Sequence, residues 1–556
     1  MRNLFTLTLL CSHLFLTAIE EADLIISSNK VILMTEKESA QPLSVAIKNK
    51  KIIWIGSHED AKNIQGEHVD FGNQAVLPGF IDAHGHASYL AFATQVANIA
   101  SPPVGKINNI QDLQTELKNF IQDSGLQPGE WLMGLGYDDS LLAEQRHPTK
   151  DDLDEVSTEH PIYLIHVSAH LGAANSLGLS LANINSKTQD PPGGKIRRYE
   201  NSLEPNGVFE ETAAYPLQQL AMSAYKDPIG SVKKAMEIYA RNGITTAQDG
   251  ASSLETIGLM QAADAQNMID IDVISYPIGQ NGLDENLNAL NFGSYTGRVK
   301  VGGIKLILDG SPQGKTAYLT EPYYKPPHNE SKSYKGYPLI PQTEVSEWVK
   351  KYADLNIPIM AHANGDAAAD MLIKAVKNAE IESDHRTIMI HAQTVREDQL
   401  DLMKELEIIP SYFSTHTFYW GDWHRDSVFG IDRAMRISPT KSTLNRDMPF
   451  TVHNDAPVVP PDMIRLLWSS TNRITRSGKI LGDQQKISTY DALKAMTLNA
   501  AYQHFEDDIK GSIEVGKLAD LVVLSEDPLA MPAASLLNLK VIATYSHGKE
   551  IFKATK

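Results

Sequence analysis

The sequence has a single cysteine, Cys11, among 556 residues. Cys11 lies in LFTLTLLCSHLFLTA, an apolar stretch between Arg2 and Glu20 that predicts a signal peptide over residues 1–18, with cleavage after Ala18. The mature chain would then contain no cysteine, which excludes disulfides, thiolate metal sites and a cysteine nucleophile. The stretch predicts a periplasmic or secreted protein of the bacterial type. The alternative is a cytoplasmic protein with an apolar first helix.

Basic residues are outnumbered. The 50 lysines and arginines stand against 68 acidic residues, which gives a net charge of −18. An acidic surface repels phosphate backbones, so nucleic acid is not an expected partner. After the N-terminal stretch, no apolar run reaches the about 20 residues that span a bilayer, so no membrane partner is expected after signal-peptide removal. The sequence has no G-x-S-x-G motif, which argues against a serine hydrolase.

Short β-rich runs occupy residues 22–75 and 506–556 and predict one small β-sandwich domain formed by both termini. Between them, over residues 76–505, apolar strand-like runs alternate with helix-like stretches, which predicts an α/β fold with parallel strands. The runs predict a (β/α)8 TIM-type barrel with its chemistry at the C-terminal strand ends. The segment of about 95–240 predicts an insert between barrel strands 1 and 2. The eight best runs are 76–86, 244–250, 271–278, 303–310, 357–365, 387–393, 408–414 and 449–455.

Histidines and one aspartate fall at the ends of these runs. His84 and His86 close the first run, and residues two apart in an extended chain project to the same side. His362, His391 and Asp455 close the fifth, sixth and eighth runs. A lone His-x-His is more often a structural pair than a metal site. Ligands converging from four strand ends, however, are what a catalytic zinc-type site needs.

Lys305 lies inside the apolar run GIKLILDG. A lysine there is costly unless it is paired or uncharged. One interpretation is an ion pair inside the barrel, with Asp309 or a substrate carboxylate. The other is a desolvated amine of lowered pKa that reacts with CO₂ to give a carbamate able to bridge two metal ions. The residues alone favour neither.

The chain resembles the amidohydrolase superfamily of metal-dependent hydrolases. The resemblance rests on PGFIDAHGH, on the strand-end histidines and aspartate, and on the tail GSIEVGKLADLVVL. More narrowly, GYDD, PPGGKI, IKLILDGSPQGKTA, AHANGDAAAD and HNDAPVVPPDM resemble the YtcJ-like (amidohydrolase 3) branch, which includes N-substituted formamide deformylases. The match runs in order from about Ala22 to the C-terminus. One departure is that His453 and Asn454 precede Asp455, where the family commonly has Gly-Ser.

The resemblance implies a metal-bearing barrel with two divalent ions. Zinc is the expected metal, although manganese, cobalt or iron would accept the same ligands. It also implies roles for individual residues. His170 and His416 match histidines that recur in this branch and are expected to bind substrate, the alternative being structural histidines. Asp309 is expected beside the substrate or orienting a ligand. The implied metal ligands are His84, His86 and Asp455 for one ion, His362 and His391 for the other, and carboxylated Lys305 as the bridge.

The expected function is hydrolysis of a carbon–nitrogen bond in a small-molecule amide, N-formyl or N-acyl. A hydroxide between the metals would attack, with Asp455 as general base and then general acid. The alternatives are a mononuclear deaminase, an esterase or lactonase of the same superfamily, and an inactive barrel that serves as a binding module. A homo-oligomer is compatible with the sequence, which does not fix the oligomeric state.

Overall fold

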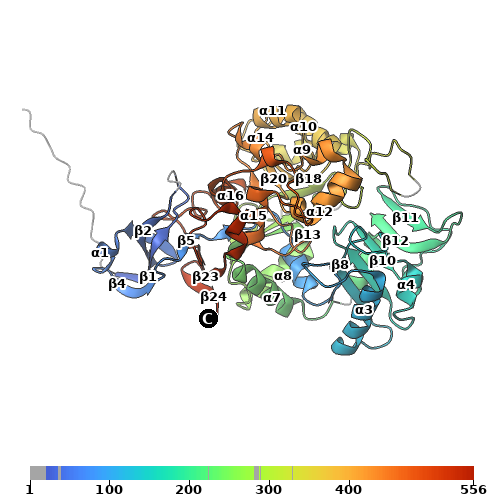
Figure 1. The fold of residues 1–556 in the computed structure, drawn as a ribbon, viewed down its shortest axis with the longest axis horizontal. Coiled ribbons are helices and arrows are strands. Elements are labelled where there is room, and N and C mark those ends of the chain that lie inside the picture. Colours follow the sequence, from blue (N-terminus) through green and yellow to red (C-terminus); the bar gives the residue numbers. More distant parts are fainter. Residues whose placement is uncertain are drawn as a thin grey trace, which may run out of the picture.

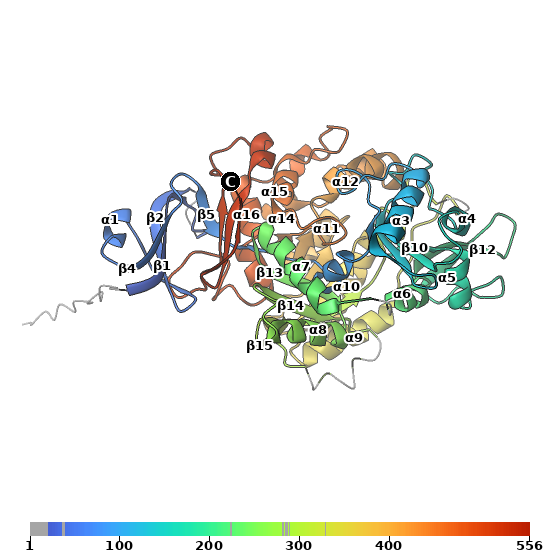
Figure 2. The same cartoon turned by 90° about the horizontal axis from the view of Figure 1, so that it is seen from below.

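The computed structural model describes residues 21–35, 39–222, 225–280, 283, 287, 290–327 and 330–555. The predicted signal peptide lies outside the described residues. The molecule is elongated: a sheet from both ends of the chain lies at one end, the α/β part in the middle and the insert at the other end (Figures 1 and 2). Within the described ranges, no helix has both the length and the apolar character needed to cross a membrane.

The sheet at one end of the molecule combines strands from both β-rich segments. Its strand β5 runs parallel to β1 and antiparallel to β22, with Leu77 opposite Val522. Ile26, Val45 and Val523 belong to one buried apolar cluster of this sheet. A second layer, which would make it a sandwich, remains a prediction. In spatial order the strands are β24 (Lys549–Lys553), β23 (Val541–Ser546), β22 (Leu521–Leu524), β5 (Ala75–Pro78), β1 (Glu21–Val31), β2 (Gln41–Lys48) and β3 (Lys51–Gly56), while β4 (Gln65–Asp70) also pairs with β1 and is preceded by α1 (His58–Ala61).

The middle of the molecule contains two five-stranded sheets. Neighbouring strands are parallel except for the pair β15 and β16. With their flanking helices they confirm the predicted α/β class. The first sheet has the order β15 (Tyr295–Thr296), β16 (Val299–Val301), β14 (Asp272–Pro277), β13 (Ile244–Ser252) and β6 (Phe80–Ile81), and the second β17 (Ile304–Ile307), β18 (Ile359–Ala363), β19 (Ile388–His391), β20 (Ile409–Tyr412) and β21 (Thr451–Val452).

Each of the eight predicted runs contains a strand of these two sheets, but the first run is divided. Residues 75–78 form β5 of the terminal sheet, and only Phe80–Ile81 pairs with β13. Gly79 separates the two strands and lies against the side chain of Thr245, where a Cβ would stand 2.4 Å from that side chain. One apolar run therefore contributes a strand to each of two sheets.

The two sheets are not hydrogen-bonded into one closed sheet. At one junction, an isolated parallel bridge joins Ile278 to Lys305. At the other, the backbone N–H of Asp455 donates to the carbonyl of His84 at 3.1 Å, and that of His86 donates to Ala456 at 2.8 Å. These bonds bring the ends of β6 and β21 together. A continuous (β/α)8 barrel remains a prediction.

Helices cover both sheets. In α10, Ala368, Leu372 and Val376 are buried while Lys374 and Lys377 are exposed, the three- and four-residue spacing of a helix with one apolar face. The helices of this part are α7 (Pro228–Arg241), α8 (Leu254–Ala265), α9 (Gln342–Asp354), α10 (Asp366–Ala379), α11 (Glu397–Glu405), α12 (His416–Trp423), α13 (Ile431–Ala434), α14 (Thr440–Leu444), α15 (Met463–Asn472), α16 (Thr489–Ala495) and α17 (Leu498–Gln503), with the short turns η2 (His424–Val428), η3 (Asp483–Gln485) and η4 (Ala533–Asn538).

The insert has its own sheet and its own apolar core, to which Leu113, Leu132 and Leu164 belong. Helix α7 falls within the predicted insert of about 95–240, yet it packs against α2, α8 and β13. The insert strands in spatial order are β11 (Gly194–Arg198), β12 (Pro205–Glu211), β10 (Leu171–Ala174), β9 (Ile162–His166), β8 (Leu132–Tyr137) and β7 (Ala97–Asn98), and the neighbouring helices are α2 (Ala87–Ala93), α3 (Ile110–Ser124), α4 (Lys150–Asp154), α5 (Ser176–Leu181) and α6 (Tyr215–Met222).

Candidate functional site

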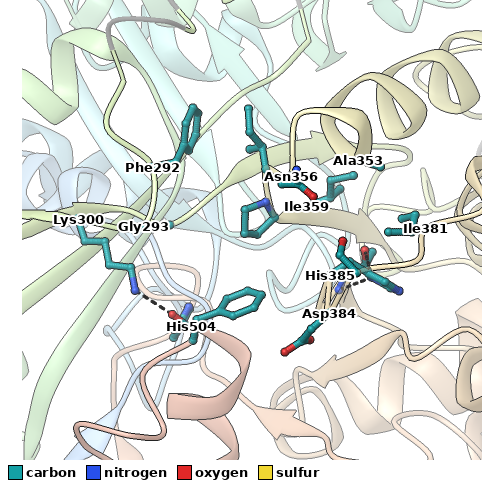
Figure 3. A pocket seen from close by; sticks show the side chains of 16 residues that line it. Phe292, Gly293, Lys300, Ala353, Asn356, Ile359, Ile381, Asp384, His385 and His504 are labelled. Atoms are coloured by element: carbon teal, nitrogen blue, oxygen red, sulfur yellow. Dashed lines mark hydrogen bonds between the residues drawn. The ribbon is translucent and has the colours of Figure 1, made fainter.

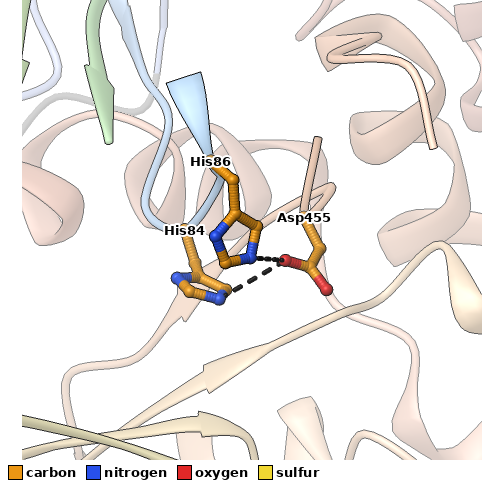
Figure 4. Close-up of side chains that lie close together, drawn as sticks. All are labelled: His84, His86 and Asp455. Carbon is orange, nitrogen blue, oxygen red and sulfur yellow. Dashed lines mark hydrogen bonds and ion pairs between the residues drawn. The ribbon is translucent and has the colours of Figure 1, made fainter. Parts of the chain in front are cut away.

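Three of the predicted ligands meet where β6 and β21 end. The Nε2 atom of His86 lies 3.0 Å from Oδ1 of Asp455, and Nε2 of His84 lies 3.4 Å from the same oxygen (Figure 4). One ligand atom from each of the three residues falls within 4.8 Å of the others. His84 is 1% exposed and Asp455 is 7% exposed, so these two are shielded from bulk water, whereas the side chain of His86 is 21% exposed.

Lys305 approaches this group from β17. Its Nζ lies 3.3 Å from Nε2 of His84, and the residue is 1% exposed. Burial lowers the pKa of Lys305 to about 7, although the charge of Asp455 acts in the opposite direction. Near neutral pH a large fraction of this amine is therefore uncharged. Of the two interpretations from the sequence, the pair with Asp309 is not formed, because Asp309 bonds elsewhere.

His362 and His391 complete the cluster from β18 and β19. Their ring centroids are 4.5 Å apart, and the ring of His391 lies 5.5 Å from that of His84. Nε2 of His391 is 4.0 Å from Oδ2 of Asp455. Burial lowers the pKa of His84, His362 and His391 well below the usual histidine value. These three rings are therefore neutral at pH 7, the form that ligates metal ions.

The Nδ1 atom of each of these four histidines is engaged by the protein. His84 contacts Oε1 of Gln248 at 2.6 Å, and His86 contacts the carbonyl oxygen of Gly250. His362 contacts Oδ1 of Asp309 at 3.1 Å, and His391 contacts Nε2 of His453 at 3.2 Å. Nδ1 engagement that leaves Nε2 toward a ligand is typical of metal-binding histidines. His84, His86 and His391 fit this arrangement, whereas Nε2 of His362 also contacts Nδ2 of Asn364 at 3.2 Å, a contact that a bound ion would replace.

The arrangement also fits a cation on electrostatic grounds. With a proton on Nδ1, the Nε2 atoms of His84 and His86 carry lone pairs, and both face a carboxylate oxygen of Asp455. Acceptors that face one another in a buried site are unfavourable unless a proton or a cation lies between them. Burial raises the pKa of Asp455, but the interactions with His86 and other basic neighbours outweigh burial and hold the pKa below its ordinary value, so the carboxylate is ionised. A proton or a cation must then lie between Oδ1 and Nε2 of His86, and a bound cation would take the place of that proton.

The predicted substrate-binding residues lie at different distances from the cluster. His170 is beside it: its ring centroid is 5.1 Å from that of His362, and its Nδ1 contacts Glu211 at 2.7 Å. Burial lowers the pKa of His170, but Glu211 outweighs burial and raises it. His416 is linked to the cluster through Phe413. The ring of Phe413 contacts those of His416 and His391, with centroid distances of 4.4 and 6.1 Å.

Asp309 lies behind His362 and is completely buried. Its Oδ1 accepts from the backbone N–H of Asn364 at 3.0 Å, and its Oδ2 accepts from those of Gly365 and Tyr318 at 2.8 and 3.0 Å. Burial raises the pKa of Asp309 to about 7, while these backbone N–H groups act in the opposite direction. Asp309 is thus placed to orient a ligand, and its role in binding substrate remains a prediction.

Four residues whose side chains hydrogen-bond to the clustered rings or to that of His170 were not among the predicted site residues: Gln248, Asn364, His453 and Glu211. Gln248 and Asn364 lie within two residues of the ends of the predicted second and fifth runs, so the strand-end rule that selected the histidines could have found them. His453 precedes Asp455 at the position where the sequence departs from the family pattern. Glu211 lies in the insert and is brought to His170 by the pairing of β10 with β12, for which the sequence has no local signal.

A separate cavity of about 340 Å³ lies at the opposite ends of the strands (Figure 3). Gly302 and Pro358, which line it, come just before β17 and β18. Lys300 faces this cavity, and its Nζ is bonded to the carbonyl of His504 and to Glu506. None of the predicted ligands lines this cavity, so the candidate site is confined to the C-terminal strand ends.

Comparison with known proteins gives consistent matches. A family model described as the amidohydrolase family matches residues 67–552. The chain is 26% identical over 545 residues to N-substituted formamide deformylase of Arthrobacter pascens, covering 94% of this chain and 97% of that protein. It is 24% identical over 545 residues to the putative amidohydrolase YtcJ of Bacillus subtilis (strain 168), covering 93% and 97%. Its fold is similar to that of an uncharacterized metal-dependent hydrolase from Pyrococcus horikoshii OT3, with a TM-score of 0.70, 22% identity, and coverage of 92% and 98%.

Proposed function

The chain belongs to the amidohydrolase family and is a hydrolytic enzyme that acts on carbon–nitrogen bonds, and from this premise we propose that it cleaves a small-molecule amide, N-formyl or N-acyl, with two divalent metal ions. The observation that carries the proposal is the common anchoring of His84, His86, His362 and His391 through Nδ1. The formamide deformylase of Arthrobacter pascens, similar over nearly its whole length, supports the N-formyl class.

The proposed ligands divide into two groups. His84, His86 and Asp455 would hold one ion, and His362 and His391 the other. Carboxylated Lys305 would bridge them, and zinc is the metal that we expect for such nitrogen and oxygen ligands. When bound, the ions would lower the pKa of a water molecule and stabilise negative charge on the substrate carbonyl oxygen.

Carboxylation of Lys305 requires an uncharged amine. The lone pair of Nζ forms a bond to the carbon of CO₂, one C–O π pair moves to oxygen, and Nζ releases a proton to water. The product is an anionic carbamate with two oxygen atoms. The lowered pKa of Lys305, about 7, supports this step because it leaves much of the amine uncharged at neutral pH.

Asp455 is the proposed general base and acid. Its carboxylate is ionised, lies 3.0 Å from His86 and is shielded from bulk water, so it can accept the proton of the attacking water. It would then deliver that proton to the departing amine. His170, held by Glu211 and adjacent to His362, is placed to donate a hydrogen bond to the substrate, and His416 would contribute from farther out.

The architecture that we propose around this site keeps the predicted divisions. The two central sheets are the halves of one (β/α)8 barrel over residues 76–505, and residues 22–75 and 506–556 form the β-sandwich. The pairing of β5 with β22 supports the terminal domain, and the contacts between β6 and β21 support closure. We also propose a periplasmic or secreted location for the mature chain, supported by the apolar N-terminal stretch alone.

A hydrolysis screen of metal-reconstituted protein tests the function. N-formyl, N-acyl and cyclic amides are compared with esters and lactones, and bound metal is counted in the same samples. We expect amide hydrolysis and two equivalents of divalent metal. One equivalent with amine release from an aromatic ring would favour the deaminase, and activity on esters alone would favour the esterase. Near-zero metal after metal-supplemented expression would favour a binding module.

Replacing the general base gives a sharper prediction. Asp455→Asn should lower kcat by roughly 10²–10⁴-fold, because proton transfer is lost while the amide oxygen can still face the site. Metal analysis should find much of the metal retained. Asp447→Asn, which alters an exposed aspartate, is the matched control and should leave both values unchanged. Substantial activity in Asp455→Asn would contradict the assigned role.

A further inference from the structure

A cavity of about 270 Å³ lies between the insert and the loops that follow β20 and β21. Its walls are largely apolar. Val167 of the insert, Trp420 of α12 and Val458 line it and pack in one hydrophobic cluster. Such walls would hold the apolar part of a small ligand.

Two polar groups that line this cavity have no partner within the described residues. One is a guanidinium nitrogen, Nη1 of Arg476, and the other is the hydroxyl of Ser101; both atoms are buried from solvent. Among the described residues, Arg476 has no hydrogen bond or ion pair. A buried donor without an acceptor costs about 1–3 kcal/mol, and more when it is charged, so an acceptor that enters the cavity would be bound favourably.

The carboxylate of Asp138 also lines this cavity, but it does not serve as the acceptor for Arg476. Asp138 is 2% exposed, and its Oδ2 accepts from the indole N–H of Trp420 at 2.6 Å. Its Oδ1 accepts from the hydroxyl and the backbone N–H of Ser140 at 2.6 and 2.9 Å. Burial lowers the pKa of Arg476 and the charge of Asp138 acts in the opposite direction, so the two groups interact through space. No hydrogen bond or ion pair joins them among the described residues, and Nη1 of Arg476 is left for another acceptor.

The cavity is adjacent to the candidate metal centre. The ring of Phe413 lies 6.1 Å from that of His391 and 6.1 Å from that of Trp420, which lines the cavity. Pro457 and Val458 also line it and follow Asp455 by two and three residues. A small ligand bound in the cavity would therefore lie close enough to Asp455 for one end of it to reach the proposed catalytic carboxylate.

We propose that this cavity binds the body of the substrate, and that Arg476 and Ser101 bind a carboxylate carried by it. The substrate class would be an amide whose apolar substituent bears a carboxylate. The charge and the planar fork of a guanidinium match a carboxylate, and the hydroxyl supplies a further donor. The position of the scissile amide in this inference rests on the proposed function. The anion site itself is inferred from the residues that line the cavity.

The test compares two formamides that differ by the carboxylate alone, N-formyl-L-phenylalanine and N-(2-phenylethyl)formamide. The metal-reconstituted full chain should prefer the acid in kcat/KM by roughly 10–100-fold, the range of a hydrogen bond to a charged group. Arg476→Gln should remove this preference mainly through KM, because the contact exists in the ground state as well. Ser101→Ala should cause a smaller loss. Arg436→Gln, which alters an arginine paired with Glu397 outside the cavity, should keep the preference.

Equal kcat/KM for the two formamides, or an undiminished preference in Arg476→Gln, would overturn the inference. If no amide is hydrolysed by the metal-loaded protein, the proposed function fails, and calorimetry then decides the anion site alone. In that measurement 3-phenylpropanoate should bind roughly 10–100-fold more tightly than 3-phenylpropanamide, and Arg476→Gln should abolish the difference. Equal binding of the two compounds by the unaltered chain would refute the anion site.

Discussion

At the scale of single residues, the candidate site depends on atoms behind the ligands as much as on the ligands. Four histidines are held by four different acceptors: a side-chain amide, a backbone carbonyl, a carboxylate and an imidazole. The last of these is His453, whose own Nδ1 contacts the hydroxyl of Ser411 at 2.9 Å. His453 thus links β20 to the ring of His391 and fixes its orientation.

Removing this link should weaken metal binding. His453→Ala leaves Nδ1 of His391 without its partner, and loss of such a contact typically costs roughly 10–100-fold in metal affinity. Competition with a chelator, followed by metal analysis, measures the change. Ser411→Ala, which removes only the outer contact of His453, should have a smaller effect. Unchanged affinity in His453→Ala would mean that His391 does not depend on this anchor.

The sequence could predict the ligands because they share a rule. His84, His362 and Asp455 each follow or end an apolar run, and parallel strands bring such ends together. The family resemblance that these residues suggested is confirmed by the family match. The anchors obey no common rule: Gln248 lies on a recognised run, but Glu211 reaches His170 only through the pairing of β10 with β12.

At the scale of elements, the strand ends adopt unusual backbone conformations. His391 and Asp455 have φ values of 71° and 59°, in the left-handed region that residues other than glycine rarely adopt. Each such residue costs of order 1–3 kcal/mol, which the surrounding packing must offset. Element boundaries were less predictable than the runs themselves. β6 is only two residues long because Gly79 ends β5 just before it, and β16 was not predicted.

Helix α10 contributes to that packing. Leu372 is completely buried in the central core, so Leu372→Ala should lower the free energy of unfolding by about 2–5 kcal/mol through lost burial and a new cavity. Leu355→Ala, at a position that is 53% exposed just after α9, should change it by less than about 0.5 kcal/mol. Urea denaturation of both variants measures the difference. Equal changes in the free energy of unfolding would show that burial of Leu372 does not stabilise the core.

At the scale of the whole molecule, a buried ionic network joins the central sheets to the C-terminal segment. Lys510 bonds Asp272 of β14 at 2.6 Å and Glu506 at 3.0 Å, and His547 of the terminal segment lies 3.2 Å from Asp272. Burial raises the pKa of Asp272, but Lys510 and His547 outweigh burial and hold it below the ordinary value. The ionised form of Asp272 is therefore the one that stabilises the fold.

This network predicts a dependence of stability on pH. A carboxyl with a lower pKa in the folded chain contributes stability that is present above its unfolded value, about 3.9, and is lost as the pH falls below it. The melting temperature should therefore decrease as the pH falls below about 5, and it should decrease less steeply in Asp272→Asn. Asp270→Asn, which alters a half-exposed neighbour, should follow the unaltered chain. Parallel curves for all three proteins would remove Asp272 from this role.

The position of β5 between β1 and β22 has a consequence for biosynthesis. The edge of β5 that accepts β22 is made early, whereas β22 emerges from the ribosome hundreds of residues later. At roughly 5–20 residues per second, the nascent chain carries this open edge for tens of seconds. An unpaired strand edge invites association with other chains, so a chaperone that shields the first translated β-strands would raise the yield of folded protein.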